Sequence, residues 1–341
     1  MNTSPGDYPV LQHVMRLLDA PGGALEDEPL LPDGRYQTRT VTLRQLSDEV
    51  TARLSDSLRG LSAAEFPRLF CSWGKCRVGS TALTNLFGIA GIPAFYQPVK
   101  TMMRHRLLGS EPQPWVPPQA STHPQIFSKE MAGPYLVAET IFNPVDLLIA
   151  SGYPAAKLHL VVMDRDPYSS LASWVARWSD RVPRARLVEH FVLSSLQIHR
   201  MRTCARANGV PVTHFAYEAS RRPLEAIAAL FERLDISRHF HPGVVNDWNE
   251  RGALESSQSG ISFPEEPPVY VVPGLHSSER QYAYKGRDAS NLTAAERDLV
   301  AALGLPELYR DVAGACVQDL GLDASVAAEM FGPELAASAH P

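Results

Sequence analysis

A loop rich in glycine, hydroxyl and basic residues lies between a predicted strand and a predicted helix, an arrangement suited to binding an anion. It runs from Gly74 to Gly79, after a strand predicted for 68–73 and before a helix predicted for 80–90. Glycine allows the backbone to turn tightly and to approach a ligand closely. The amide groups and the dipole at the start of a helix attract negative charge. Two cations and two hydroxyl groups add to this, on Lys75, Arg77, Ser80 and Thr81.

This segment predicts a phosphate cradle that departs from the loop of nucleoside triphosphatases. That loop has the form GxxxxGK[ST], whose lysine contacts the phosphates. Gly74 and Gly79 have the required gap, but Ser80 follows Gly79 with no lysine between them. A P-loop kinase of small molecules is an alternative function, but the lysine that such a kinase needs directly after Gly79 is absent. A binding or scaffold protein on a degenerate nucleotide fold is a further alternative, against which the intact charges argue.

A second pair of residues suited to phosphate follows the most apolar strand predicted, at 157–163. Arg165 stands just beyond the carboxyl end of this strand, and Ser173 lies eight residues later on the next predicted helix. A guanidinium group and a hydroxyl can hold one phosphate between them. Ligands of parallel sheets bind beyond the carboxyl ends of the strands. Two phosphate sites at this edge would match a ligand with phosphates at both ends of a nucleoside.

These motifs, in this order, resemble those of the sulfotransferases that use 3′-phosphoadenosine 5′-phosphosulfate (PAPS). The family's first loop has the form [KR]-x-G-[ST]-T, present here at 77–81. Its strand ending in R-[DN]-P, with a serine eight residues after the arginine, is present as 165–167 and Ser173. A strand ending in Tyr217-Glu218 precedes an amphipathic helix, which is the third family feature. The resemblance covers about residues 68–235, and the family's last loop corresponds best to 284–287, in a different residue order.

The resemblance implies a role for each of these motifs. Arg77 would hold the bridging oxygen and the sulfuryl group, and 79–81 would cradle the 5′-phosphosulfate. Arg165 and Ser173 would bind the 3′-phosphate, and Tyr217 would form a wall of the nucleotide site. The donor would be PAPS and its product adenosine 3′,5′-bisphosphate (PAP), with no metal required. The predicted donor-binding residues are Lys75, Cys76, Arg77, Val78, Gly79, Ser80, Thr81, Arg165, Ser173, Tyr217, Lys285, Gly286 and Arg287.

The implied reaction moves a sulfuryl group to a hydroxyl or amine of a small molecule, and a general base must take the acceptor proton. Many family members use a histidine near a lysine on a middle strand. The corresponding segment here, 127–131, has Lys129 but no histidine. The candidates for the base are, in order, Glu139, Glu130, His123 and His105. A carboxylate in this role is expected to be partly desolvated, because burial raises its pKa.

Methionine and aromatic residues predict an apolar acceptor pocket. The predicted lining is Tyr96, Gln97, Met102, Met103 and the helix that carries Trp174 and Trp178, although tryptophans at helical spacing are more often core. The acceptor is expected to be a specialised metabolite. Another possibility is a hydroxyacyl substrate on a carrier protein, sulfated to activate it for elimination, as in the olefin-forming sulfotransferases of polyketide assembly lines.

The elements that must position these residues alternate between strand and helix. We predict strands at 68–73, 94–97, 125–128, 135–138, 157–163 and 212–216, and helices at 80–90, from 167, at 186–207 and at 223–234. This alternation predicts an α/β fold, a three-layer sandwich around a mostly parallel sheet. The resemblance implies the P-loop-like nucleotide-binding architecture of sulfotransferases. Residues 1–65 are expected to be an extension whose amphipathic helix, at 41–61, packs on a sulfotransferase domain at 66–341.

The composition is that of an ordinary globular protein. Of 341 residues, 45% are hydrophobic and 20% charged, with a net charge of −5, which argues against a nucleic-acid-binding surface. No apolar stretch reaches the roughly 18 residues of a membrane span, and the first residues lack signal-peptide features. We therefore expect a cytoplasmic protein with no membrane partner, and a homodimer stays open. The scattered Cys71, Cys76, Cys204 and Cys316 predict neither a disulfide framework nor a zinc site.

Overall fold

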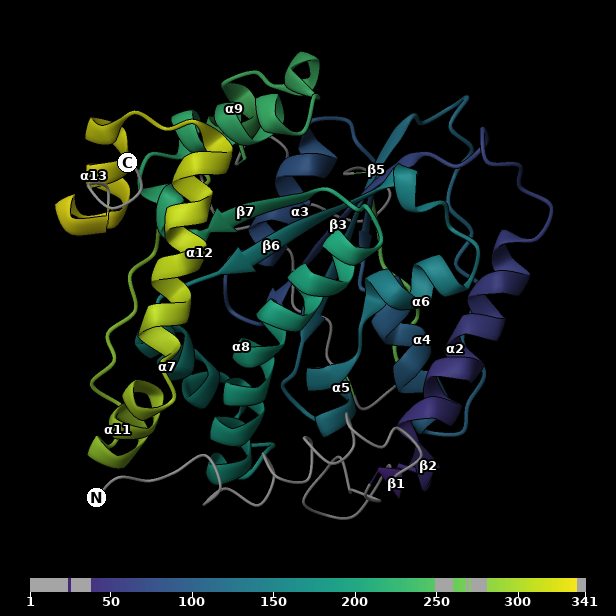
Figure 1. Ribbon diagram of the computed structural model, residues 1–341, viewed down its shortest axis with the longest axis horizontal. Helices are drawn as coiled ribbons and strands as arrows, with labels where there is room; N and C mark the ends of the chain where they lie inside the picture. Colours follow the sequence, from purple (N-terminus) through teal and green to yellow (C-terminus); the bar gives the residue numbers. More distant parts are fainter. Residues whose placement is uncertain (1–23, 26–37, 249–259, 268–269, 271–280, 336–341) are drawn as a thin grey trace.

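Six parallel strands form the central sheet of the protein, in the order β7-β6-β3-β5-β4-β8. The computed structural model describes residues 24–25, 38–248, 260–267, 270 and 281–335 (Figure 1). The strands are β3 (Arg68–Lys75), β4 (Ala94–Tyr96), β5 (Gln125–Ala132), β6 (Leu158–Asp164), β7 (Val212–Ala216) and β8 (Ile261–Ser262). A separate antiparallel pair joins β1 (Ala24–Leu25) to β2 (Val41–Thr42).

Successive strand residues point alternately into two apolar cores, one on each face of the sheet. In β6, Leu158, Leu160 and Val162 belong to a first core, whereas Val161 and Met163 belong to a second. Because helices cover both faces, β6 is buried along its whole length and its residues 160–163 are all apolar. The predicted three-layer α/β sandwich is confirmed.

Each core is closed by its own set of helices. The first core is covered by α2 (Leu43–Leu58), α4 (Pro98–Leu107), α5 (Val137–Ile141), α6 (Pro144–Ala150), α7 (Pro167–Trp178), α8 (Arg184–Ala207) and α11 (Ala294–Ala302). The second is covered by α3 (Ser80–Ile89), α9 (Pro223–Arg233), α10 (Gly243–Asn246), α13 (Ala324–Phe331) and most of α12 (Leu305–Leu320). Short 3₁₀ turns lie at Ala155–Lys157, Tyr217–Arg221 and Ser237–His239.

Helix α2 shares the core of the sheet. Thr42 and Gln45 form a capping box at its start, in which each side chain bonds the other's backbone N–H. Its buried residues, among them Leu46, Val50 and Leu54, belong to the first core. They pack where α2 crosses α4 and α6, at one end of the view in Figure 1. The predicted amphipathic helix therefore exists and is integrated into the main body of the protein.

Three of the predicted strands differ from the structure by more than one residue at an end. The strand expected at 125–128 continues to Ala132 as β5. The strand expected at 135–138 is wrong, because Gly133, at a φ of +68°, and Pro134 turn the chain after β5, and the residues that follow form α5. Strand β3 continues two residues beyond its expected end, through Gly74 and Lys75. A Cβ on Gly74 would lie 2.0 Å from the carbonyl oxygen of Met163, so only glycine lets β3 and β6 approach this closely.

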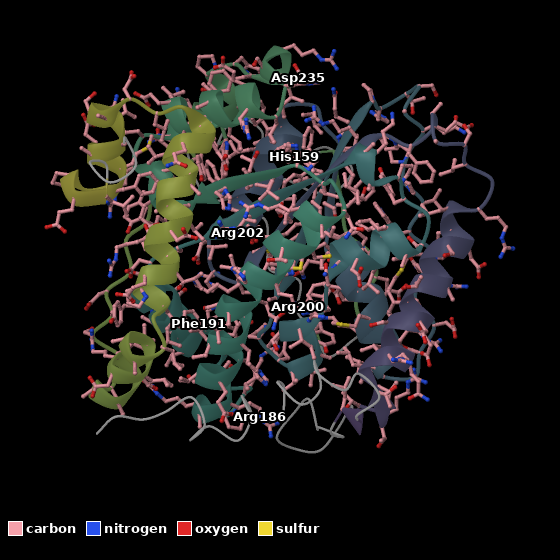
Figure 2. All side chains as sticks on the ribbon, in the orientation of Figure 1. His159, Arg186, Phe191, Arg200, Arg202 and Asp235 are labelled. Atoms are coloured by element: carbon pink, nitrogen blue, oxygen red, sulfur yellow. The ribbon has the colours of Figure 1, made fainter. Side chains whose placement is uncertain are left out.

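The chain leaves β3 and β6 on opposite faces of the sheet. After β3 it enters α3 on the face of the second core, and after β6 it enters α7 on the face of the first core. Such a divergence opens a crevice at the carboxyl ends of the two strands, where open α/β sheets bind their ligands. The opposite, amino-terminal edge is marked by His159 at the start of β6 and by Asp235, both labelled in Figure 2.

Candidate active site

A cavity of about 630 Å³ lies at the carboxyl-terminal edge of the sheet. Its volume falls within the range typical of small-molecule sites. Residues at or just beyond the ends of β3, β4, β6 and β7 line it, together with the starts of α3 and α4, one face of α7 and the segment 281–287. The cavity therefore occupies the crevice between the diverging connections of β3 and β6.

Most of the predicted site residues line this one cavity. The structure brings together Cys76, Arg77, Gly79, Ser80, Thr81, Tyr96, Gln97, Lys129, Arg165, Ser173, Trp178, Tyr217, Lys285, Gly286 and Arg287. The two phosphate motifs are therefore halves of a single site. The 284–287 segment lies beside them, even though its residue order departs from the family pattern.

Gly79 forms the turn that starts α3. It adopts a φ of +81°, and a Cβ at this position would lie 2.5 Å from Cδ2 of Tyr217. The ring of Tyr217 thus packs directly against the loop backbone. No side chain caps the first turn of α3, so the amide groups of Ser80 and Thr81 stay available to an anion in the cavity.

Arg77 and Arg165 converge from the two motifs. Nε of Arg77 donates a hydrogen bond of 2.9 Å to Oγ of Ser173 on α7. Arg165 donates to the carbonyl oxygens of Arg77 (3.3 Å) and Lys285 (3.0 Å). Its guanidinium group lies 4.5 Å from the ring centroid of Tyr217. Nε of Arg165 is buried and has no hydrogen-bond partner, so this donor remains for a ligand.

The segment 284–287 is attached to the same residues through its backbone. The hydroxyl of Tyr217 accepts a hydrogen bond of 3.0 Å from the N–H of Lys285, whose carbonyl oxygen accepts from Arg165. The N–H of Tyr284 donates to the carbonyl oxygen of Ser220 at 3.0 Å. These bonds hold the segment against the side of the cavity that Tyr217 and Arg165 line.

The cavity concentrates positive charge. Of the described residues that line it, nine are lysines or arginines, namely Arg77, Lys100, Arg104, Lys129, Arg165, Arg177, Arg181, Lys285 and Arg287. Within the same set, Glu266 is the only residue with a carboxylate. The whole chain carries a net charge of −5, so this concentration is local. Such a cavity favours a ligand with several negative charges.

Lys129 lies at the centre of the cavity wall, on β5. Its Nζ is 3.2 Å from Oγ1 of Thr81 and 3.7 Å from the ring centroid of Tyr96. Burial lowers the pKa of Lys129 to about 7, and the neighbouring cations Lys100 and Arg104 act in the same direction. An anion bound beside Thr81 would favour the protonated amine.

Two residues of the predicted donor loop do not line the cavity. Because β3 continues through Lys75, strand alternation turns this side chain into the first core. There it forms a buried ion pair with Asp164 at the end of β6, and its Nζ lies 5.4 Å from the ring centroid of Phe191, labelled in Figure 2. Val78 is fully buried in the second core. The predicted contact of Lys75 with the donor is therefore wrong.

The two carboxylates predicted as bases are enclosed by other groups. Burial would raise the pKa of Glu139, but ion pairs with Arg104 (2.7 Å) and Lys100 (3.8 Å) lower it. Glu130 accepts hydrogen bonds from the N–H groups of Val99 (2.9 Å) and Lys100 (3.1 Å) at the start of α4. Burial raises the pKa of Glu130 to about 7. Neither carboxylate lines the cavity, so both position α4 and its side chains.

The predicted histidines also lie outside the cavity. His123 is exposed two residues before β5, at the amino-terminal edge of the sheet. His105 is engaged by Oγ of Ser110 (2.9 Å) and the carbonyl oxygen of Glu265 (2.8 Å). These two candidates for the base are therefore wrong on position alone.

Only some of the residues predicted to form the acceptor pocket line the cavity. Tyr96, Gln97 and Trp178 line the cavity, whereas Met102 and Met103 are buried in the first core on the other side of α4. Trp174 is core as well, and its Nε1 donates to the carbonyl oxygen of Cys76 at 2.8 Å.

Sequence reasoning missed several lining residues. They are Lys100, Arg104, Tyr135, Arg177, Arg181, Trp248, Glu266, Tyr270 and Tyr282. Arg177 follows Ser173 by four residues on α7, so helical spacing could have revealed it. Glu266 carries no such signal, because it lies in an irregular segment with prolines on both sides.

Comparison with known proteins identifies no relative: neither a family model, nor a curated protein, nor a solved structure matches the chain. Within the described ranges, no helix is long and apolar enough to cross a membrane. The same ranges contain no group of three or more metal-ligating side chains. All four cysteines are free, and Cys71 and Cys316 are buried.

Proposed function

We propose that this protein is a sulfotransferase that moves the sulfuryl group of PAPS to a hydroxyl or amine of a small molecule. One observation carries the proposal. Arg77 and Arg165 belong to motifs 88 residues apart, yet they meet in one cavity lined by nine cations. The residues of this cavity fit a donor that has phosphate groups on both sides of a nucleoside.

The 5′ end of the donor would lie at the start of α3. The free amides of this helix, the hydroxyl of Thr81 and the guanidinium of Arg77 offer donors to the phosphosulfate. The 3′-phosphate would lie beside Arg165, whose buried Nε lacks a partner, and beside Ser173. This assignment gives the unpartnered donor its acceptor.

The adenine would lie against an aromatic wall. Trp248 and Tyr282 both line the cavity, and their rings are stacked with centroids 5.8 Å apart at 30°. Aromatic faces stack on nucleobases without requiring specific hydrogen bonds. The wall stands beside 283–287, next to the predicted 3′-phosphate site.

The reaction forms a bond between the acceptor oxygen or nitrogen and sulfur, and breaks the bond between sulfur and the 5′-phosphate oxygen. The electron pair of the broken bond stays on the phosphate, so negative charge grows on the leaving oxygen. Arg77 and protonated Lys129 would stabilise this charge, and the loop amides would add fixed donors. Tyr96, Tyr135, Trp178 and Tyr270 give the acceptor side aromatic walls, which suit a phenolic or aromatic acceptor.

A small-molecule kinase fits this site less well. The position after Gly79 is Ser80, and the nearby Lys75 points into the first core. The carboxylate of Asp164 at the end of β6 is buried in an ion pair with Lys75, whose positive charge competes with the binding of Mg²⁺ there.

Ligand-induced thermal stabilisation separates the two functions. PAP without metal is expected to raise the melting temperature, with a gain of about 2.7 kcal/mol at one hundred times its Kd. ATP with Mg²⁺ is expected to stabilise the protein far less. The variant Arg77→Ala should lose most of the PAP effect, whereas Arg59→Ala, at a side chain that is 80% exposed, should keep it. Transfer of ³⁵S from labelled PAPS to 2-naphthol tests the chemistry, and stabilisation by ATP with Mg²⁺ alone would refute the proposal.

A further inference from the structure

Glu266 is the carboxylate that lines the cavity among the described residues, and one of its two oxygens has no partner there. Its side chain is 5% exposed and comes from the segment that follows β8. Oε1 accepts hydrogen bonds of 2.9 Å from Oγ1 of Thr101 and from Arg104. Oε2 is buried and has no hydrogen-bond donor among the residues that the structure describes. A buried lone pair without a donor is costly in a folded protein, so this oxygen is available to a ligand.

The orientation of this carboxylate is fixed by neighbours on α4 and beyond. Arg104 donates through Nε to Glu139 (2.7 Å) and through its terminal nitrogen to Glu266 (2.9 Å). The guanidinium group also lies 3.9 Å from the ring centroid of Tyr270. Glu139 therefore holds Arg104, and Arg104 together with Thr101 holds Oε1. These contacts restrain the carboxylate through Oε1, while Oε2 is not used by them.

Glu266 is connected to the donor loop through Tyr96. The hydroxyl of Tyr96 is hydrogen-bonded to Thr81, and Lys129 lies over its ring. Arg104 and Glu266 are both close enough to Tyr96 to act on it electrostatically. A group bound between Tyr96 and Glu266 would therefore be next to the phosphosulfate held by 79–81.

We propose that Glu266 is the general base that takes the proton from the acceptor, an inference that rests on the proposed sulfotransferase function. The acceptor O–H or N–H donates to Oε2. As the acceptor atom bonds to sulfur, its proton passes to Oε2, and the 5′-phosphate leaves with the electron pair of the broken bond. Arg104 forms ion pairs with both Glu139 and Glu266, and its contact with Glu266 is to Oε1, which leaves Oε2 to accept the proton.

The test removes the basic oxygen while keeping the shape of the side chain. In Glu266→Gln, we expect kcat for sulfuryl transfer from PAPS to 2-naphthol to fall by about 10²- to 10³-fold. Stabilisation by PAP should stay unchanged, because Glu266 lies beyond the donor loop. Glu265→Gln is the matched control: its neighbouring carboxylate is exposed and bonds only Gln113 among the described residues, so kcat should stay within about threefold.

A second variant separates a missing base from a disturbed cavity. Glu266→Ala leaves space for a small carboxylate. Added formate is therefore expected to raise the kcat of this variant at least tenfold. Absence of rescue by formate would overturn the proposal, even if Glu266→Gln is inactive or unstable. Full turnover in Glu266→Gln would overturn it as well, while leaving the sulfotransferase function standing. If the unchanged protein neither binds PAP nor transfers ³⁵S, the proposed function fails and the inference fails with it.

Discussion

Arg165 provides the sharpest test of how the nucleotide is bound. The variant Arg165→Gln removes the guanidinium group whose Nε lacks a partner and whose other nitrogens bond two backbone carbonyls. A hydrogen bond from a charged group contributes about 1.5–3 kcal/mol. Two such bonds to a 3′-phosphate, partly replaced by Ser173 and Lys285 in the variant, give an expected loss of about 3 kcal/mol. This corresponds to about 150-fold weaker binding of PAP.

Calorimetric titration with two ligands tests the assignment to the 3′-phosphate. The unchanged protein should bind PAP at least about 100-fold more tightly than AMP, which lacks that phosphate. Arg165→Gln should lose most of this preference, and its affinity for AMP should change by less than about threefold. The melting temperature without ligand reports separately on the lost bonds to Arg77 and Lys285. Equal weakening of PAP and AMP, or no preference for PAP in the unchanged protein, would refute the reasoning.

Three further changes test the loop, the buried ion pair and the central lysine. Gly79→Ala places a Cβ against the ring of Tyr217 at a positive φ, so urea denaturation should show a loss of about 1–3 kcal/mol, and an unchanged midpoint would contradict this close approach. Lys75→Met leaves Asp164 buried without its partner and should cost about 3–5 kcal/mol, of which the double variant with Asp164→Asn should recover a large part. Burial lowers the pKa of Lys129 to about 7, so the unfolded chain binds more protons than the folded one from about pH 7 to pH 10.5. The free energy of unfolding should therefore gain up to about 5 kcal/mol as pH rises through this window, and Lys129→Met should lack that gain; identical pH profiles would contradict the lowered pKa.

The fold and the meeting of the two loops in one cavity could be predicted because their signals are local. An apolar strand followed within a few residues by Gly79 and hydroxyls identifies a loop at a strand end, whatever the rest of the chain does. Arg165 and Ser173 are likewise set by one strand and the helix that follows it. Parallel strands then bring both loops to one edge. The prediction of these two loops did not depend on any contact between segments that are distant in the sequence.

The place of Glu266 in the cavity wall and the inward turn of Lys75 could not be predicted, because each depends on a contact that no local pattern encodes. Arg104 and Glu266 are 162 residues apart and meet only when β8 joins the sheet. Glu139 looked like a base because it is an acid beside a predicted strand, but it is enclosed by cations of α4. The side of the sheet that Lys75 faces depends on where β3 ends. Because β3 ends two residues later than predicted, the side chain of Lys75 lies in the core and not in the cavity.

Strand β8 makes one side of the cavity less stable to local unfolding than the other. It has two residues, lies at the edge of the sheet, and pairs only with β4, yet Glu266 follows it by four positions. Short edge strands unfold locally at a smaller free-energy cost than central strands such as β3 and β6, which precede Arg77 and Arg165. The molecule can therefore lose the alignment of Glu266 with its donor loop still intact, so heat would abolish turnover before it abolishes nucleotide binding.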